Sequence, residues 1–105
     1  MAFGVMGGFM QPQGHAQVIV RMADYGQNPQ TALDAPRFRV EKGLEVGIEP
    51  GFDPSVYEGL RDLGHELVVA ERRTVSFGGA QAIYRLDGGY CGASDARRDG
   101  QAVGF

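Results

Sequence analysis

Glycine is the residue type that most constrains how this chain folds. Seventeen of the 105 residues are glycine, roughly twice the usual share of about 7%. Because glycine has no Cβ, it ends helices, forms tight turns and lets a backbone come close to another group. A chain of this composition is turn-rich β structure, a set of sites that a ligand approaches through the backbone, or part of something larger.

Length and charge set the broad class of the chain. The 105 residues are sized for a single domain, 1–105, and exclude two domains. Hydrophobic residues make up 43% of the chain, which is enough for a core. Ten basic and thirteen acidic side chains give a formal net charge of −3, so we expect no nucleic acid and no anionic membrane as a partner.

Cysteine and histidine give no indication of a metal centre. The single cysteine, Cys91, cannot form an intramolecular disulfide, and no Cys/His cluster has zinc spacing. We therefore expect no metal and no cofactor. No apolar run is long enough for a transmembrane helix, and the apolar start lacks the positive charge and the length of a signal peptide. These observations do not assign the protein to a cellular compartment.

Apolar spacing predicts short helices and strands in alternation. Asn28-Pro29 and Asp53-Pro54 each place a proline just inside a capping residue, and Gly26 and Gly64 follow the last turn of a helix. The predicted elements are an initial strand, helices over 11–25, 28–33 and 53–63, a hairpin of 38–40 and 44–48, and a meander of strands over 67–70, 80–86 and 90–93. Residues 94–105 show no periodicity. The predicted class is α+β, with helices layered on sheet.

Charged residues alternate with apolar ones in the predicted hairpin. Such alternation indicates a sheet with one buried and one wet face, so the charged positions are expected on the wetter face. These positions are Arg37, Arg39, Glu41, Glu45 and Glu49.

Gly7 and Gly8 stand between the first strand and the first helix and are the most interesting local pattern. Their backbone N–H groups are accessible because no Cβ is in the way, and the helix adds positive potential at its N-terminus. Such a site suits an oxyanion or a carboxylate. Taken alone, a Gly-Gly pair is more often an ordinary turn.

The other single candidates favour structural roles. His15 is of the type that serves as a general base, but no nucleophile is near it in sequence, so packing or surface exposure is favoured. His65 follows Gly64 and is expected to cap a helix or face solvent. Cys91 is expected to be a small buried hydrophobe.

Polar residues are densest near the end of the chain, in Ser94-Asp95 and Arg97-Arg98-Asp99. One interpretation is an anion-binding arginine pair, and the other is a structural loop in which Asp95 pairs with an arginine or accepts backbone hydrogen bonds. The structural interpretation is favoured because each arginine has a carboxylate within two positions. Arg72-Arg73 leaves the same two alternatives open.

Several short motifs follow one another in a specific order. They are Gly4-Val5-Met6-Gly7-Gly8 with Gln11-Pro12-Gln13-Gly14-His15, the stretch 28–38 ending in Ala-Pro-Arg-Phe, Leu63-Gly64-His65, the stretch 79–83, and the stretch 92–97. The series resembles the C-terminal portion of gamma-glutamyltranspeptidase-like proteins, a family of N-terminal-nucleophile hydrolases. The first motif is more similar to the bacterial gamma-glutamyltransferase-like and acylase-like branch than to the glutathione-degrading enzymes.

The resemblance implies a fold, a reaction and a site. The fold is the C-terminal portion of a four-layer αββα sandwich, with an antiparallel sheet and packed helices, in the small subunit. Members cleave themselves into a large and a small subunit, and the new N-terminal threonine is the nucleophile for gamma-glutamyl or acyl transfer or hydrolysis. Gly7 and Gly8 match the glycine pair whose N–H groups form the oxyanion hole. Members are often exported.

The chain also departs from the family pattern. The family's nucleophile lies upstream of the glycine pair, the second residue here is Ala2, and Thr31 and Thr74 are internal. We expect half an oxyanion hole, no nucleophile in this chain and no activity of the chain alone. The expected partner is the missing upstream segment or large subunit of the same enzyme. Because part of a sandwich exposes strand edges and inner faces, we also expect self-association.

One alternative of another class remains. The chain could be a non-catalytic oligomeric module, or a small-anion binder acting through Gly7 and Gly8, derived from the same fold.

Overall fold

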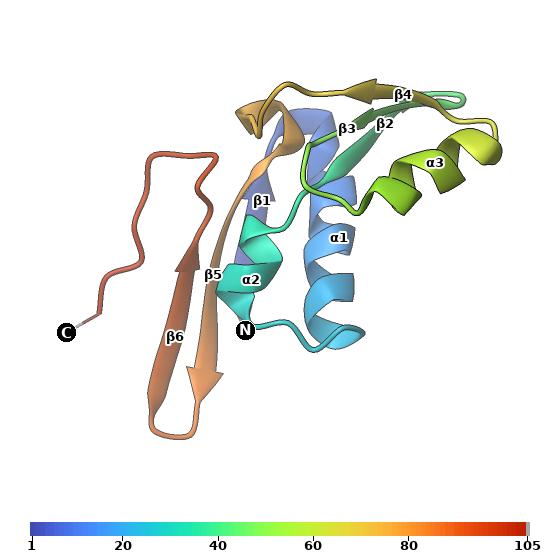
Figure 1. Ribbon diagram of the computed structural model, residues 1–105. Helices are drawn as coiled ribbons and strands as arrows, with labels where there is room; N and C mark the ends of the chain where they lie inside the picture. The colour runs from blue at the N-terminus through green and yellow to red at the C-terminus, as the bar shows by residue number, and fades with distance from the viewer. Residues whose placement is uncertain (105) are drawn as a thin grey trace.

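A computed structural model describes residues 1–104 and shows two three-stranded sheets with helices packed beside them (Figure 1). The order is β1 (Ala2–Met6), η1 (Gly8–Met10), α1 (Gln11–Ala23), α2 (Pro29–Asp34), β2 (Phe38–Lys42), β3 (Glu45–Ile48), α3 (Pro54–Asp62), β4 (Glu66–Val69), η2 (Val75–Phe77), β5 (Gly79–Leu86) and β6 (Gly89–Ser94). The predicted α+β class is confirmed. No helix among the described residues has the length and apolar character needed to cross a membrane.

The first sheet has the strand order β1-β5-β6 and is antiparallel throughout. Successive side chains along each strand point to opposite faces, and one of these faces packs against α1 and α2. The core between them is built from small and branched side chains, which let the helices approach the sheet closely. They are Val5, Val18, Leu33, Ala80, Ala82 and Ala93, with Phe3 and Met22 at the margin.

The opposite face of this sheet is largely open. Met6, Ile83 and Tyr90 point to this side and expose 61%, 54% and 75% of their surface. The end of the chain runs along this side: Arg98 lies against Gly79, and residues 101–104 line a hollow together with Gly4, Gln81 and Ile83. A sheet with one packed and one uncovered face has room for a further layer.

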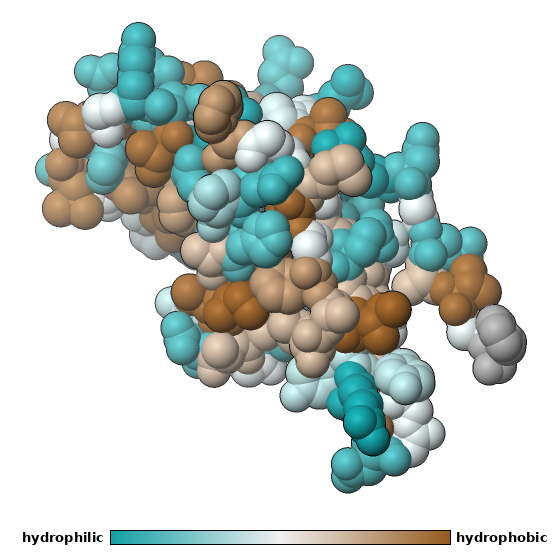
Figure 2. Space-filling view, turned by 180° about the vertical axis from the view of Figure 1, so that it is seen from behind, coloured by the Kyte–Doolittle hydropathy of each residue, from teal (hydrophilic) through white to brown (hydrophobic). Residues whose placement is uncertain are grey.

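The second sheet has the order β2-β3-β4 and differs from the prediction. β2 and β3 form the expected antiparallel hairpin, whereas β4 pairs with β3 in parallel and does not join a meander with β5 and β6. The intervening α3 supplies the long connection that a parallel pair requires. Hydrophobic atoms gather at this end of the molecule (Figure 2), where Leu44, Val68 and Val69 are exposed.

α1 closes the edges of both sheets. The Gln13 side-chain amide accepts from the N–H of Val40 at 2.8 Å and donates to its carbonyl at 3.2 Å, and Gln17 makes the same pair of bonds with Phe38 at 3.1 and 2.9 Å. On the other side of the helix, His15 accepts from the N–H of Val5 in β1. These side chains take the place of a neighbouring strand at otherwise free edges.

Helix ends follow the sequence signals, but the buried faces differ from expectation. Asn28 and Asp53 cap α2 and α3, each accepting a backbone N–H bond at 2.9 Å. α1 ends at Ala23, and Tyr25, expected on its apolar stripe, is 73% exposed. None of the residues in Pro54–Asp62, all of them described, is buried.

Candidate functional site

Gly7 and Gly8 form the turn that connects β1 to the first helical turn, η1. Gly8 has a φ of +59°, in the left-handed region, and a Cβ built there would meet nothing within 4 Å. A Cβ on Gly7 would lie 3.0 Å from the backbone Cα of Gly78. The two glycines are therefore required for different reasons: Gly8 for its conformation beside open space, and Gly7 for close contact with another backbone.

In this turn the backbone carbonyls accept hydrogen bonds, whereas the backbone N–H groups do not donate to a neighbouring loop. The carbonyl of Gly7 accepts from the N–H of Met10 at 3.1 Å, and that of Gly8 accepts from the N–H of Gln11. Outside regular helix and strand pairing, no group in residues 1–104 accepts the N–H of Gly7 or Gly8. The turn therefore presents N–H groups at the start of a continuous helical segment, where an anion is stabilised.

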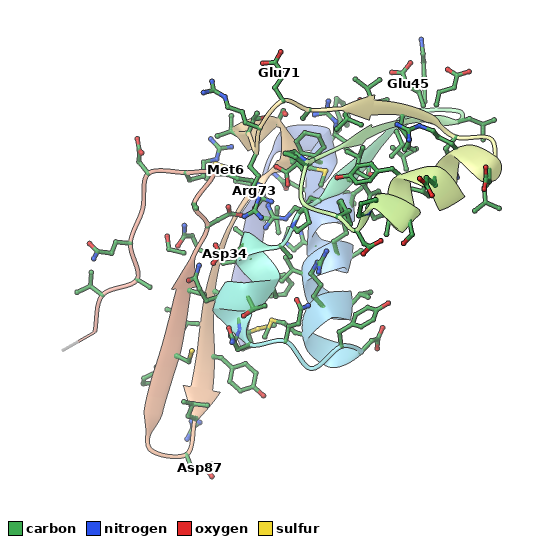
Figure 3. The ribbon with its side chains drawn as sticks, viewed as in Figure 1. Met6, Asp34, Glu45, Glu71, Arg73 and Asp87 are labelled. Carbon is green, nitrogen blue, oxygen red and sulfur yellow. The ribbon has the colours of Figure 1, made fainter. Side chains whose placement is uncertain are left out.

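A hollow with both polar and apolar lining lies beside the turn. It is lined by Met6, Gly79, Gln81 and Arg98, among others. Met6, at the end of β1, faces the loop that follows β6 (Figure 3). The Arg98 side chain lies across Gly79, where a Cβ would be 2.3 Å from its Cγ.

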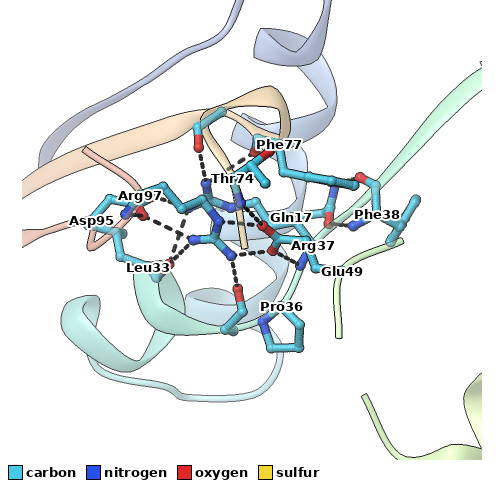
Figure 4. Close-up of polar contacts among 12 residues, drawn as sticks. Gln17, Leu33, Pro36, Arg37, Phe38, Glu49, Thr74, Phe77, Asp95 and Arg97 are labelled. Carbon is cyan, nitrogen blue, oxygen red and sulfur yellow. Dashed lines mark hydrogen bonds and ion pairs between the residues drawn. The ribbon is translucent and has the colours of Figure 1, made fainter. Parts of the chain in front are cut away.

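Behind the turn is a buried cluster of two arginines and two carboxylates (Figure 4). Asp95 pairs with Arg37 at 2.8 Å, from Oδ2 to Nη2, and with Arg97 at 3.0 Å, from Oδ1 to Nη1. Arg97 also donates through Nε to Glu49 Oε1 at 2.8 Å and through Nη2 to the other carboxylate oxygen. The cluster is neutral as a whole, and its four side chains expose at most 2% of their surface.

The cluster holds the backbone that supports the glycine turn. Arg37 Nη1 donates to the carbonyl of Gly78 at 3.1 Å, and Asp95 accepts the N–H of Ala80 at 2.9 Å. Gly78 is the residue that Gly7 packs against. The position of the turn therefore depends on four charged residues that lie just before β2, just after β3 and in the segment after β6.

Burial, hydrogen bonds and neighbouring charges together shift the pKa values in this cluster. Burial raises the pKa of Asp95, but the N–H of Arg97, the charge of Arg37 and the N–H of Ala80 outweigh it, so that the pKa lies below its ordinary value. Burial and the like charge of Arg97 lower the pKa of Arg37. For Arg97, burial is outweighed by the bonds and charges of Glu49 and Asp95, which raise its pKa. The pairs are ionised because each charge is matched.

The prediction that the five charged residues of the hairpin lie on a solvent-exposed face is wrong for two of them. Arg37 is 1% exposed and Glu49 is fully buried. The N–H of Glu49 donates to the carbonyl of Arg37, the N–H of Arg37 donates to the Glu49 carboxylate, and the two side chains meet Asp95 and Arg97. The structural interpretation of the Asp95 and Arg97 cluster is confirmed by these pairs. Arg98 is not a member of the cluster.

The remaining candidates are dispersed. His15 lies in the first turns of α1 and packs against Phe3, with 5.3 Å between ring centroids. His65 is half-buried before β4. Cys91, expected to be buried, is only half-buried because β6 is an edge strand. Within residues 1–104, no three His, Cys, Asp or Glu side chains are grouped to hold a metal ion.

The whole chain, residues 1–105, matches the family model described as gamma-glutamyltranspeptidase. The chain belongs to the gamma-glutamyltranspeptidase family. Cephalosporin acylase from Bacillus halodurans has the same fold, with a TM-score of 0.90 and 44% identity over 98% of this chain and 19% of that one. Other solved members of the family also share the fold, which is that of the N-terminal-nucleophile hydrolases.

Two curated relatives agree with this assignment to the gamma-glutamyltranspeptidase family. The glutathione hydrolase-like YwrD proenzyme of Bacillus subtilis is 36% identical over 98% of the chain and 21% of its own length. The oxamate amidohydrolase proenzyme of Klebsiella pneumoniae is 32% identical over 100% of the chain and 21% of its own length. The chain thus spans about a fifth of the length of these relatives.

The two internal threonines of this gamma-glutamyltranspeptidase segment, Thr31 and Thr74, do not have the features of an N-terminal nucleophile. Thr31 is exposed in α2, and its N–H is bonded to Asn28. The Thr74 hydroxyl accepts the N–H of Ser76 and caps η2. Neither has the free amine that activates an N-terminal threonine.

Sequence reasoning missed the contribution of Gly78, Glu49 and Val5 to the turn. Gly78 precedes the motif 79–83, and its contact with Gly7 exists only in the folded chain. Periodicity carried no signal for Glu49, since its partners are distant along the chain.

Proposed function

We propose that this chain is the C-terminal part of a gamma-glutamyltransferase-like enzyme and supplies backbone N–H donors of its oxyanion hole through Gly7 and Gly8. The observation that carries the proposal is the geometry of this turn. Gly8 faces open space in a left-handed conformation, Gly7 is held against Gly78, and both stand at the start of a helix. Membership of the family supports the same assignment.

The turn would act on the carbonyl of an amide substrate. Attack by a nucleophile places negative charge on the carbonyl oxygen of the tetrahedral intermediate. N–H groups held at the start of a helix stabilise that charge without reorganising, and losing one such donor typically lowers kcat by about 10²–10³-fold. The rigid support from Gly78 keeps the N–H groups in place during the reaction.

The nucleophile is proposed to come from an upstream segment. Thr31 and Thr74 are internal, so neither has the free amine of an N-terminal threonine. The chain by itself then binds an oxyanion but breaks no bond. Its partner is the upstream segment or large subunit, for which the open face of the β1-β5-β6 sheet offers a place to pack.

The reaction class follows from what the relatives have in common. Their names describe hydrolysis of glutathione, hydrolysis of an oxamate amide and removal of an acyl group from a cephalosporin. All three involve an acyl group on nitrogen. We propose gamma-glutamyl or acyl transfer or hydrolysis for the complete enzyme.

The test uses a chromogenic gamma-glutamyl anilide and a chromogenic acyl anilide. The chain is assayed alone, after mixing with an upstream family segment, and as a chimera in which it replaces the matching segment of the Bacillus halodurans acylase. We expect no turnover alone and turnover in the chimera. Turnover by the isolated chain that survives loss of both Thr31 and Thr74 would contradict the missing nucleophile.

The chimera also tests the turn itself. Gly8→Val fills the open space and strains the backbone, so kcat per titrated active site should fall by at least about 100-fold. Gly59→Val is the matched control, because Gly59 lies in α3 with nothing within 4 Å of its Cβ. Equal kcat in both variants would remove the oxyanion assignment.

A further inference from the structure

His15 connects α1 to the strand that leads into the glycine turn. Its Nε2 accepts the N–H of Val5 at 3.2 Å, and its Nδ1 lies 2.6 Å from the carbonyl oxygen of Gln11. A carbonyl only accepts and a backbone N–H only donates, so the proton is on Nδ1 and Nε2 is bare. Both bonds exist together only in this neutral tautomer.

Val5 is a point where three segments meet. A Cβ on Gly14 would lie 2.7 Å from Val5 Cγ1, and a Cβ on Gly78 would lie 2.8 Å from the same atom. The Val5 side chain is therefore wedged between α1 and the segment before β5, and the His15 bond holds its backbone. Both glycines are needed for this close approach.

The contacts continue from Val5 to the turn. Gly78 touches Val5 on one side and Gly7 on the other, and Gly7 follows Val5 by only two residues. A shift of β1 relative to α1 would move Gly7 against Gly78 and tilt its N–H group. Protein interiors are packed densely enough to transmit such a shift.

We infer that His15 is a positioning residue for the oxyanion turn and acts through its hydrogen bond with the Val5 N–H. Glycine at position 14 leaves the space that the Val5 side chain occupies beside α1. The inference rests on the proposed function of Gly7 and Gly8. His15 touches no reacting group, because both of its ring nitrogens are occupied by backbone atoms of Val5 and Gln11. Its role is to fix the register of β1 against α1.

The test compares three variants in the acylase chimera. His15→Leu removes the acceptor for Val5, whereas His15→Gln restores one with its side-chain carbonyl. Gln17→Leu is the matched control, because Gln17 is on the same helix and makes two bonds to Phe38 in β2 but none to β1. kcat is measured per titrated active site, which separates it from the amount of folded enzyme.

We expect His15→Leu to lower kcat by about 10–100-fold with little change in KM, as for a catalytic group displaced by about 1 Å. His15→Gln and Gln17→Leu should each stay within about threefold of the parent, because the oxyanion donors remain in place. Retained kcat in His15→Leu, or an equal loss in His15→Gln, would overturn the inference.

Hydrogen exchange separates this inference from the proposed function. The Val5 amide should exchange faster in His15→Leu and keep its protection in His15→Gln. Loss of kcat without faster exchange at Val5 would reject the positioning role. If Gly8→Val leaves kcat unchanged while Val5 exchange responds as expected, the contact to β1 stands and the oxyanion role of the turn fails.

Discussion

At the scale of single residues, the most consequential feature is a set of four buried charged side chains. Arg37, Glu49, Asp95 and Arg97 are all buried, and each of these side chains forms at least one ion pair with a side chain of opposite charge. Removing one member leaves the others as uncompensated buried charges, which is far more costly than losing a surface ion pair. Arg37 of this cluster donates to the carbonyl of Gly78, and Gly78 contacts Gly7, so the cluster restrains the position of the turn.

Asp95→Asn tests this cluster. The variant should lower the free energy of unfolding by about 3–5 kcal/mol, because Arg37 and Arg97 lose their shared counter-charge. Urea denaturation followed by circular dichroism at neutral pH measures the loss. Asp87→Asn, in the exposed β5–β6 turn, is the control and should stay within about 0.5 kcal/mol of the parent.

The same carboxylate predicts a pH dependence. The pKa of Asp95 is lower in the folded chain than its ordinary value, so the unfolded chain binds the extra proton. The stability from Asp95 is full above about pH 4, the ordinary aspartate range, and is lost as the pH falls from there towards the folded pKa. Asp95→Asn should remove this part of the acid slope, and an unchanged slope would contradict the assignment.

At the scale of elements, local signals place the helices and strands well. Asn28 and Asp53 cap helices as predicted, and Gly43 and Gly88 lie in the turns of the two hairpins. The sequence pattern does not predict which strands pair when they are distant along the chain. β4 joins β3 because α3 carries the chain back in the same direction, which apolar spacing does not reveal.

α1 yields a prediction at this scale. Replacing both Gln13 and Gln17 by leucine opens the β2 edge, so the amides of Phe38 and Val40 should exchange faster with solvent. Each substitution should cost about 1–2 kcal/mol, the net value of the two hydrogen bonds it removes. Gln11→Leu serves as the control, and unchanged exchange in the double variant would show that the amides do not seal the edge.

At the scale of the whole molecule, one sheet has an uncovered face. Met6, Ile83 and Tyr90 are exposed there, and the tail over 101–104 covers only part of it. Exposed apolar surface of this kind marks an interface. In the complete enzyme the upstream segment is proposed to take this place, and in the isolated chain a second copy can do so.

We therefore predict self-association of the isolated chain at micromolar concentration. Ile83→Glu should shift sedimentation velocity towards the monomer, because it puts a charge in the centre of the open face. Val68→Glu changes a residue that is similarly exposed but lies on β4. A clean monomer before any substitution, or an effect of Val68→Glu alone, would count against this interface.

The sequence by itself determined the short elements, the helix caps, the glycine turn and the family resemblance, because each depends on residues close together in the chain. Only the tertiary structure decided which charges are buried and what holds the turn. Arg37 and Asp95 are 58 residues apart, and Glu49 and Arg97 are 48 apart. An alternating charged residue has the same pattern whether water or a distant counter-ion solvates it, so the choice is made only when the sheets come together.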